Sequence, residues 1–154
     1  KVKYLGYGFY RKKGKCRLRV HPKAKSKLKE NLRAITNRNK AISNEIRPIK
    51  FNQIAKGWVN YFKLADMAGM LREMDEWVRR RIRAIYWAQW KKVKTKYRMI
   101  RQYNIPEWKV HELANCRKGI WRAAVMLNQI LTNKEIARQG YITLTDYYRQ
   151  VSEN

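Results

Sequence analysis

The longest uninterrupted helical pattern in this sequence runs from Met70 to Lys94. It contains no proline and no glycine, so no residue in it breaks or weakens a helix. Apolar side chains recur at every third or fourth position, which is the spacing of one buried helix face: Leu71, Met74, Val78, Ile82 and Ile85. The sequence therefore predicts one long helix against which the rest of the chain packs.

Cationic and aromatic side chains form a second stripe on the same stretch. At helical spacing it contains Arg79, Arg83, Tyr86, Trp87, Trp90 and Lys94. Arg80 and Lys91 lie next to it. We expect this stripe to remain exposed and to meet a polyanion, with arginine and lysine contacting phosphates and the rings stacking on unpaired bases. Core packing is the open alternative for Trp87 and Trp90, and it is the expected role of Trp77.

The charge balance supports this expectation. The 154 residues include 37 Lys and Arg against 11 Asp and Glu, a formal net charge of +26. So large a charge disfavours the compact state unless a partner neutralises it, and nucleic acid is the first candidate. A hydrophobic content of 45% excludes a disordered basic tail. No apolar run is long enough to span a membrane, and no signal peptide is recognisable.

The N-terminal region reads as a β-hairpin. Residues 2–10 and 15–20 are rich in β-forming side chains and are separated by a basic turn that ends in Gly14. The sequence begins at Lys1 without an initiator methionine, so we expect a fragment of a longer protein.

Two further helices are predicted before the long one. Pro22 suits the first position of a helix over residues 23–39, in which Ala24, Leu28, Leu32 and Ile35 form a narrow apolar stripe. We expect the remaining surface of that helix to contact phosphate through Lys23, Lys25, Lys27, Lys29, Arg33, Arg38 and Lys40.

A broad aromatic face predicts the next helix, over residues 49–66, after a connection that ends at Pro48. Core packing is the expected role of that face, which contains Phe51, Ile54, Trp58, Tyr61, Phe62 and Ala65. Gly57 costs about 1 kcal/mol inside a helix relative to Ala, so we expect it to mark a close approach between helices.

Short helices are predicted beyond Lys94. Residues 97–103, 106–114, 120–131 and 143–151 have helical patterns, and Thr132 with Glu135 forms a capping box that opens another helix, which ends at Gly140. A basic loop over residues 115–119 contributes Arg117 and Lys118 as further candidate nucleic-acid contacts.

No catalytic, metal-binding or cofactor-binding set can be assembled from the sequence. The aspartates are scattered, without a pair that could hold a catalytic cation. Cys16 and Cys116 have only two histidines beside them, which does not give a zinc site, and we expect two free thiols. The Asp and Glu residues early in the long helix are interpreted as helix support, through pairs such as Asp75 with Arg79.

Five motifs together resemble one family. YLGYGF at 4–9, HPK at 21–23, GWVNYF at 57–62, WVRRRIRAIYWAQWKK at 77–92 and KGIWRAA at 118–124 are similar to the C-terminal third of bacterial group II intron reverse transcriptases, which are intron-encoded maturases. The resemblance covers nearly the whole chain. This sequence contains neither the Tyr-x-Asp-Asp motif of the family's polymerase nor its optional C-terminal endonuclease.

The resemblance implies a mainly α fold with three parts. Residues 1–20 would be a hairpin at the end of the palm, residues 21–94 a three-helix thumb, also called the X or maturase domain, and residues 95–154 a small basic helical segment linked to DNA binding. The implied partners are group II intron RNA, an RNA template–DNA primer duplex, target DNA, and the fingers and palm of the same reverse transcriptase. No membrane partner is implied.

The implied function is that of the RNA-binding thumb of an RNA-directed DNA polymerase, active in RNA splicing and retrohoming. In a bacterium it would be cytoplasmic and associated with the nucleoid or a ribonucleoprotein. Two alternatives remain open: a basic nucleic-acid-binding or ribosome-associated protein indifferent to sequence, and a stand-alone nuclease.

Overall fold

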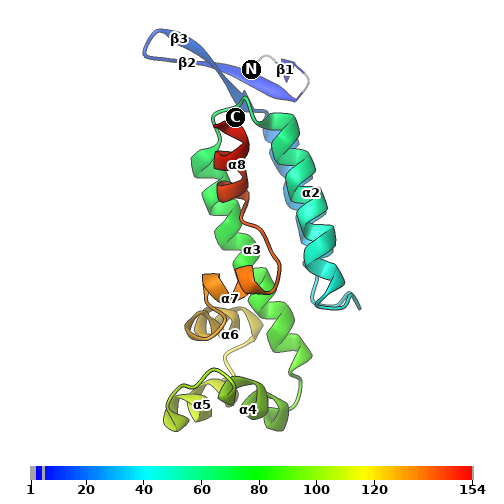
Figure 1. The fold of residues 1–154 in the computed structure, drawn as a ribbon, viewed down its shortest axis with the longest axis vertical. Coiled ribbons are helices and arrows are strands. Elements are labelled where there is room, and N and C mark those ends of the chain that lie inside the picture. Colours follow the sequence, from blue (N-terminus) through cyan, green and yellow to red (C-terminus); the bar gives the residue numbers. More distant parts are fainter. Residues whose placement is uncertain (1–2, 5, 154) are drawn as a thin grey trace.

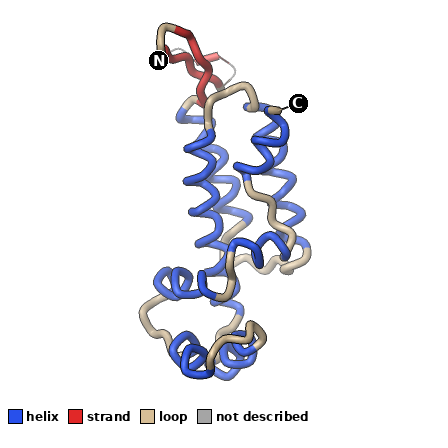
Figure 2. Tube along the Cα trace, turned by 60° about the vertical axis from the view of Figure 1, so that its left-hand side comes forward, coloured by secondary structure: helices blue, strands red, loops and turns tan. Residues whose placement is uncertain are grey.

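The computed structural model describes residues 3–4 and 6–153 and is mainly helical, as predicted (Figure 1). Val2 and Leu5 of the predicted first strand lie outside the described residues. A small sheet lies at one end of the molecule, long helices form the middle, and two short helices lie at the other end (Figures 1 and 2). The elements are β1 Lys3–Tyr4, β2 Tyr7–Lys12, β3 Lys15–Val20, α1 Pro22–Ile35, α2 Ile46–Phe62, α3 Ala68–Gln89, α4 Val93–Arg101, α5 Glu107–Ala114, α6 Ile120–Met126, the 3₁₀ turn η1 Leu127–Gln129, α7 Asn133–Arg138 and α8 Leu144–Ser152.

The predicted hairpin is confirmed as β2 and β3, but the predicted first strand over residues 2–10 is divided, because Lys3 and Tyr4 form β1 and pair antiparallel with β2. Lys12 pairs with Lys15, so the loop is the two residues Lys13 and Gly14. Both have positive φ, 51° and 75°, as a type I′ hairpin turn requires. The predicted first strand therefore continues two residues beyond Tyr10.

The sheet is attached to the helices by hydrogen bonds near the end of α2. The Tyr7 hydroxyl donates to the carbonyl of Tyr61 at 2.6 Å, and the Asp66 amide donates to the carbonyl of Leu18 at 2.9 Å. At Gly6, with φ of 84°, a Cβ would lie 2.9 Å from the Phe62 ring. A side chain is excluded there because the chain passes directly over that ring.

The α1 helix has the predicted start and the predicted buried stripe. Pro22 is its first residue, and Leu28, Leu32 and Ile35 are buried. The helix ends at Ile35 and not at Asn39, and both the backbone N–H and the hydroxyl of the capping residue Thr36 donate to the carbonyl of Leu32, the hydroxyl at 2.6 Å.

The α2 helix begins three residues earlier than predicted. Pro48 is its third residue, where a helix needs no backbone N–H, so the proline is tolerated inside the first turn. Phe51, Phe62 and Ala65 are buried as expected, but Tyr61 is 55% exposed. Gly57 is also exposed, and a Cβ there would meet no atom within 4 Å. The predicted close approach at Gly57 is therefore wrong.

The α3 helix buries its predicted apolar stripe. Leu71, Met74, Val78, Ile82 and Ile85 are each at most 4% exposed. The helix ends at Gln89, however, and the expectation that it runs to Lys94 is wrong. The chain turns at Trp90, whose side chain is buried, and Lys94 belongs to α4.

The C-terminal half forms the predicted short helices and folds back onto the long ones. The α6 helix packs on α3, and α8 packs against both α2 and α3. Asp75 of α3 accepts hydrogen bonds from the Leu144 amide at 2.8 Å and from the Thr145 amide at 3.0 Å. Asp75 thereby holds the start of α8. The sequence alone indicates for Asp75 only support of its own helix, through a pair with Arg79. In the described part of the chain, no helix could cross a membrane.

Candidate nucleic-acid interface

The second stripe of α3 is largely buried, which contradicts its predicted exposure. Arg83, Tyr86, Trp87 and Trp90 are between 4% and 8% exposed. The C-terminal helices cover this face, because α4, α6 and α7 fold back against α3. These four side chains are therefore part of the core and are not available to a polyanion at the surface.

Arg83 shows how the covered stripe is held. Its Nε donates to the carbonyl of Leu131 at 2.7 Å, and its Nη2 donates to Oδ1 of Asn133 at 3.1 Å. Burial, together with the neighbouring charge of Arg79, lowers the pKa of Arg83 to about 10. The guanidinium stays charged at neutral pH and ties α3 to the chain that leads into α7.

The aromatic members of the stripe are covered in a similar way. The Tyr86 hydroxyl donates to Oε1 of Gln139 at 3.2 Å, and burial raises the pKa of Tyr86 to about 12. Lys96 of α4 lies 4.2 Å from the centre of the Trp87 ring. The Trp87 ring therefore stacks on a lysine of its own chain.

Arg80 is exposed, as predicted, whereas Arg79 is half-buried and so only partly meets the prediction. They line a groove of about 300 Å³ between α3 and α6, whose other lining residues include Glu76, Asn128 and Asn133. The groove offers both guanidinium and amide groups to a ligand.

The cationic surface of α1 has the predicted exposure. Lys23, Lys25, Lys27 and Arg33 are exposed and Lys29 is half-buried. The opposite side of the helix is fixed by its buried leucines. The α1 helix therefore presents positive charge from a rigid support.

The most concentrated feature of this surface is a half-buried indole, Trp77 of α3, with three cations around it. Lys29 Nζ lies 5.1 Å from the ring centroid, and the guanidinium carbons of Arg33 and Arg81 lie 5.6 and 5.2 Å from it. All three are within the range of a cation–π contact. We call Trp77, Lys29, Arg33 and Arg81 the Trp77 cluster.

Arg81 fixes the geometry of the cluster. Its Nε donates to Oγ1 of Thr36 at 2.9 Å, and its Nη2 donates to the carbonyl of Arg33 at 3.1 Å. Burial and the charges of Arg33 and Arg38 lower the pKa of Arg81. The cations therefore repel one another, and an anion bound among them would relieve that repulsion.

A second cation–aromatic pair lies beyond the end of α1. The Arg38 guanidinium lies 5.4 Å from the centre of the Trp121 ring, and Trp121 on α6 is 45% exposed. Trp77, Arg81 and Trp121 were not among the predicted contacts, and Trp77 was expected in the core. Trp77 and Arg81 are four residues apart on one helix, a spacing that could have indicated this pair, whereas the pairing of Arg38 with Trp121 depends on the tertiary fold.

The remaining predicted contacts lie toward the other end of the molecule. Lys91 is exposed between α3 and α4, and Lys94 is exposed on α4. Arg117 and Lys118 are exposed in the loop before α6. Cys16 and Cys116 are free thiols, as predicted. Within residues 3–4 and 6–153, no three His, Cys, Asp or Glu side chains are grouped to hold a metal ion.

Comparison with known proteins agrees with this cationic helical surface. Residues 25–104, from α1 into the turn after α4, match the family model described as group II intron, maturase-specific domain. No curated protein matches the chain significantly. Because the family match covers more than half of the sequence, the chain belongs to the group II intron maturase-specific domain family.

Proposed function

We propose that this chain grips group II intron RNA through the exposed cations of α1 and the Trp77 cluster, and so assists splicing. Membership of the maturase-specific family supports intron RNA as the ligand. The observation that carries the proposal is the set of three cations around Trp77 at the junction of α1 and α3. Cations contact phosphates at any sequence, while a half-exposed indole can stack on an unpaired base.

The surface suits a folded RNA because it is rigid. The α1 helix is held from below by buried Leu28 and Leu32, and Arg81 fixes its C-terminal end to α3. Little side-chain and backbone order then has to be created on binding, so more of the interaction energy appears as affinity. The groove with Arg79 and Arg80 extends the candidate contact surface along α3.

In an intact reverse transcriptase, we propose that the same bundle acts as the thumb and holds the RNA template–DNA primer duplex. The attachment of the β2–β3 hairpin at the end of α2 supports this, because it would give the bundle a fixed position relative to a palm. Residues 95–154 would add contacts to target DNA, as the resemblance implies.

The test compares two triple variants with equal loss of charge. Lys25→Gln, Lys29→Gln and Arg33→Gln remove cations from α1, whereas Lys50→Gln, Lys56→Gln and Lys63→Gln remove exposed cations from α2 and from the residue that follows it. Affinity for intron RNA is measured by filter binding over a range of salt concentrations. For the α1 variant we expect the slope of log K against log salt to become shallower by about 2 to 3, because each lost phosphate contact contributes about 1. The α2 variant should change it much less.

Equal losses in the two triple variants would contradict the proposed surface. Competition with bulk transfer RNA then separates specific from indifferent binding: an excess of transfer RNA should displace the intron RNA poorly. If transfer RNA competes as well as intron RNA does, the chain is a general basic binder. A Trp77→Leu variant keeps an apolar side chain but removes the indole, and it should weaken binding to intron RNA more than binding to a fully paired duplex.

A further inference from the structure

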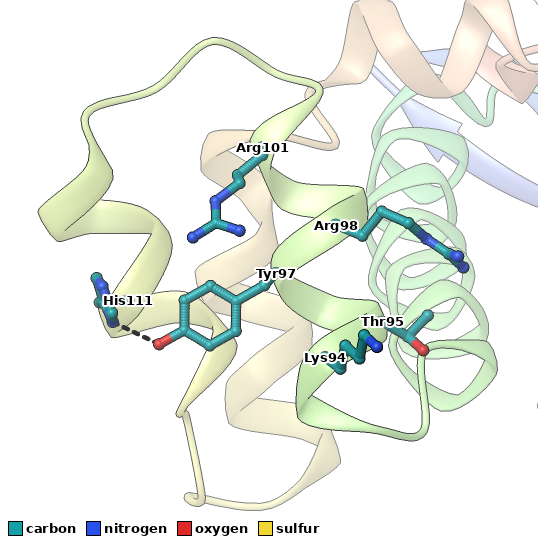
Figure 3. Close-up of a pocket in the computed structure, with 6 residues that line it drawn as sticks. All are labelled: Lys94, Thr95, Tyr97, Arg98, Arg101 and His111. Carbon is teal, nitrogen blue, oxygen red and sulfur yellow. Dashed lines mark hydrogen bonds between the residues drawn. The ribbon is translucent and has the colours of Figure 1, made fainter.

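A basic pocket lies between α4 and α5, at the end of the molecule opposite the sheet (Figures 1 and 3). Its volume is about 620 Å³, within the range of small-molecule sites. Both helices contribute to its lining, which consists of Lys94, Thr95, Tyr97, Arg98, Arg101 and His111. The pocket is separate from the α1 surface and the Trp77 cluster that are proposed above to grip intron RNA.

The centre of the pocket is held in place by a hydrogen-bond network. The Tyr97 hydroxyl and Nδ1 of His111 form a hydrogen bond (Figure 3). The Asn115 side-chain amide donates to the Tyr97 hydroxyl at 2.7 Å and to the carbonyl of His111 at 2.9 Å. The Arg101 guanidinium lies 5.1 Å from the centre of the Tyr97 ring. An aromatic ring, an imidazole and a cation are therefore fixed next to one another.

The charge of the lining favours a dianion. Lys94, Arg98 and Arg101 are cationic, and Glu107 forms an ion pair with Arg101 at 2.6 Å. If Glu107 neutralises one of these cations, two positive charges remain for a ligand. A phosphate monoester carries between about one and a half and two negative charges at neutral pH.

The shape of the pocket favours a ligand larger than a phosphate ion. Figure 3 shows Arg101 and His111 next to the Tyr97 ring, whereas Thr95 and Arg98 extend to the other side of α4, away from that ring. The polar groups are therefore spread along α4 and do not converge on one point. A ligand that contacts several of them needs a flat or apolar part next to Tyr97 in addition to an anionic group.

We propose that this pocket binds a nucleoside 5′-phosphate, with Lys94 and Arg98 holding the phosphate and the Tyr97 ring lying next to the sugar or base. Two sources have this chemistry: a free nucleotide, and the phosphorylated 5′ end of a nucleic-acid strand. The proposal does not depend on the α1 surface, so each can fail without the other.

The two histidines of the chain give a direct readout. Their ring-proton resonances are followed by NMR while AMP is added to the full chain, and a His111→Gln variant assigns the pair. We expect the His111 resonance to shift, whereas that of His21, which caps α1 at the other end of the bundle, should stay unchanged. Adenosine without phosphate should produce a shift only at concentrations at least about tenfold higher, since it cannot form a charge-assisted hydrogen bond.

Variants test the cations. A Lys94→Gln, Arg98→Gln double variant should weaken AMP binding at least about tenfold, whereas Lys134→Gln on α7 removes an exposed cation outside the pocket and should leave it unchanged. Arg98→Lys retains the charge and should retain most of the binding. Circular dichroism confirms that each variant is folded. Equal shifts of both histidines, equal binding of AMP and adenosine, or an unaffected double variant would each overturn the proposal.

Oligonucleotides distinguish the two sources. A strand with a 5′-phosphate is compared with the same strand ending in a 5′-hydroxyl. A preference of about tenfold for the phosphorylated strand, lost in the double variant, would assign the pocket to a strand end. Binding of AMP without such a preference would assign it to a free nucleotide.

Discussion

Asp75 decides at the residue scale how the C-terminal helix is attached. It is 5% exposed, and its carboxylate accepts from the Leu144 amide, the Thr145 amide and the Thr145 hydroxyl. Every one of these partners is a donor. A carboxylate, which only accepts, matches them, whereas a side-chain amide would turn one N–H₂ group toward a donor.

We therefore predict that Asp75→Asn lowers the free energy of unfolding by about 2 to 4 kcal/mol, because a buried donor loses its partner. Urea denaturation followed by circular dichroism measures the loss. Glu73→Gln, an exposed acid on the same helix, is the matched control and should change stability by less than about 0.5 kcal/mol. Similar losses of stability in both variants would show that the negative charge of these acids on α3 matters, and not the hydrogen bonds that Asp75 accepts from α8.

Tyr86 gives the fold a dependence on alkaline pH. Burial raises its pKa to about 12, above the ordinary value of 10.0. Above pH 10 the unfolded chain ionises this hydroxyl while the folded chain does not, so stability falls as the pH rises from about 10 to about 12. The contribution of Tyr86 to this loss is on the order of 2 kcal/mol.

A Tyr86→Phe variant should therefore lose less stability than the native chain over this pH range. Denaturant unfolding at about pH 9, 10 and 11 measures the free energy of unfolding of both proteins. Taking the difference between the two proteins removes most of the effect of the other tyrosines and of Arg83, because both proteins contain them. Parallel pH profiles for the two proteins would show that Tyr86 is not responsible.

Arg47 organises the connection between α1 and α2 at the scale of elements. It is 1% exposed, and burial lowers its pKa. Its guanidinium donates to the carbonyls of Ile35 at 2.8 Å, Asn37 at 3.1 Å, Lys40 at 2.9 Å and Ile42 at 3.4 Å. One planar side chain thus satisfies four carbonyls, at the end of α1 and in the connection to α2.

We predict that Arg47→Met costs about 3 to 5 kcal/mol, because several buried carbonyls lose their donor together. Arg47→Lys should recover little of this stability, since a single ammonium group cannot reach all the carbonyls that the two terminal nitrogens of the guanidinium contact. Lys50→Gln, on the same helix and exposed, serves as the control. Full recovery by lysine would mean that the charge matters and the fork does not. Thermal unfolding of the three variants measures these differences.

Elements with a strong local signal were predicted well. Pro22, Gly14 and the Thr132 capping box mark their helix or turn through backbone chemistry that acts within a few residues. The end of α3 at Gln89 has no such signal, because the chain turns there in order to bury Trp90. The apolar periodicity of the sequence alone therefore predicted, wrongly, that the helix continues to Lys94.

The candidate site was predicted in part for the same reason. Periodicity separated two stripes on α3 but could not show that α4, α6 and α7 cover the second one. Arg83 and Trp87 were therefore assigned to the surface, although a charged and an aromatic side chain can both be buried once partners satisfy them. The lysines of α1 were assigned correctly to an exposed surface because a narrow apolar stripe leaves the rest of a helix in water.

The whole molecule carries a net charge of +26 that its own acids do not balance. The ion pairs found in the described part of the chain are at the surface, for example Arg17 with Asp66 and Arg101 with Glu107. Repulsion among the remaining cations opposes folding, while the same cations attract RNA. Salt screens both interactions, since the Debye length falls from about 10 Å at 0.1 M to about 3 Å at 1 M.

Folding and RNA binding should therefore respond to salt in opposite directions. Raising NaCl from about 0.05 M to about 1 M should raise the Tm by several degrees, because each kcal/mol of relieved repulsion is worth about 2 to 4 °C for a domain of this size, while affinity for intron RNA falls by orders of magnitude. The triple variant Lys25→Gln, Lys29→Gln and Arg33→Gln removes three cations from α1, so it should show both a smaller rise in Tm and a shallower loss of affinity. Differential scanning fluorimetry and filter binding on the same samples measure the two responses. A Tm that stays constant or falls with salt would mean that the cations are already compensated within the folded chain, and the argument that they are held ready for a polyanion would then fail.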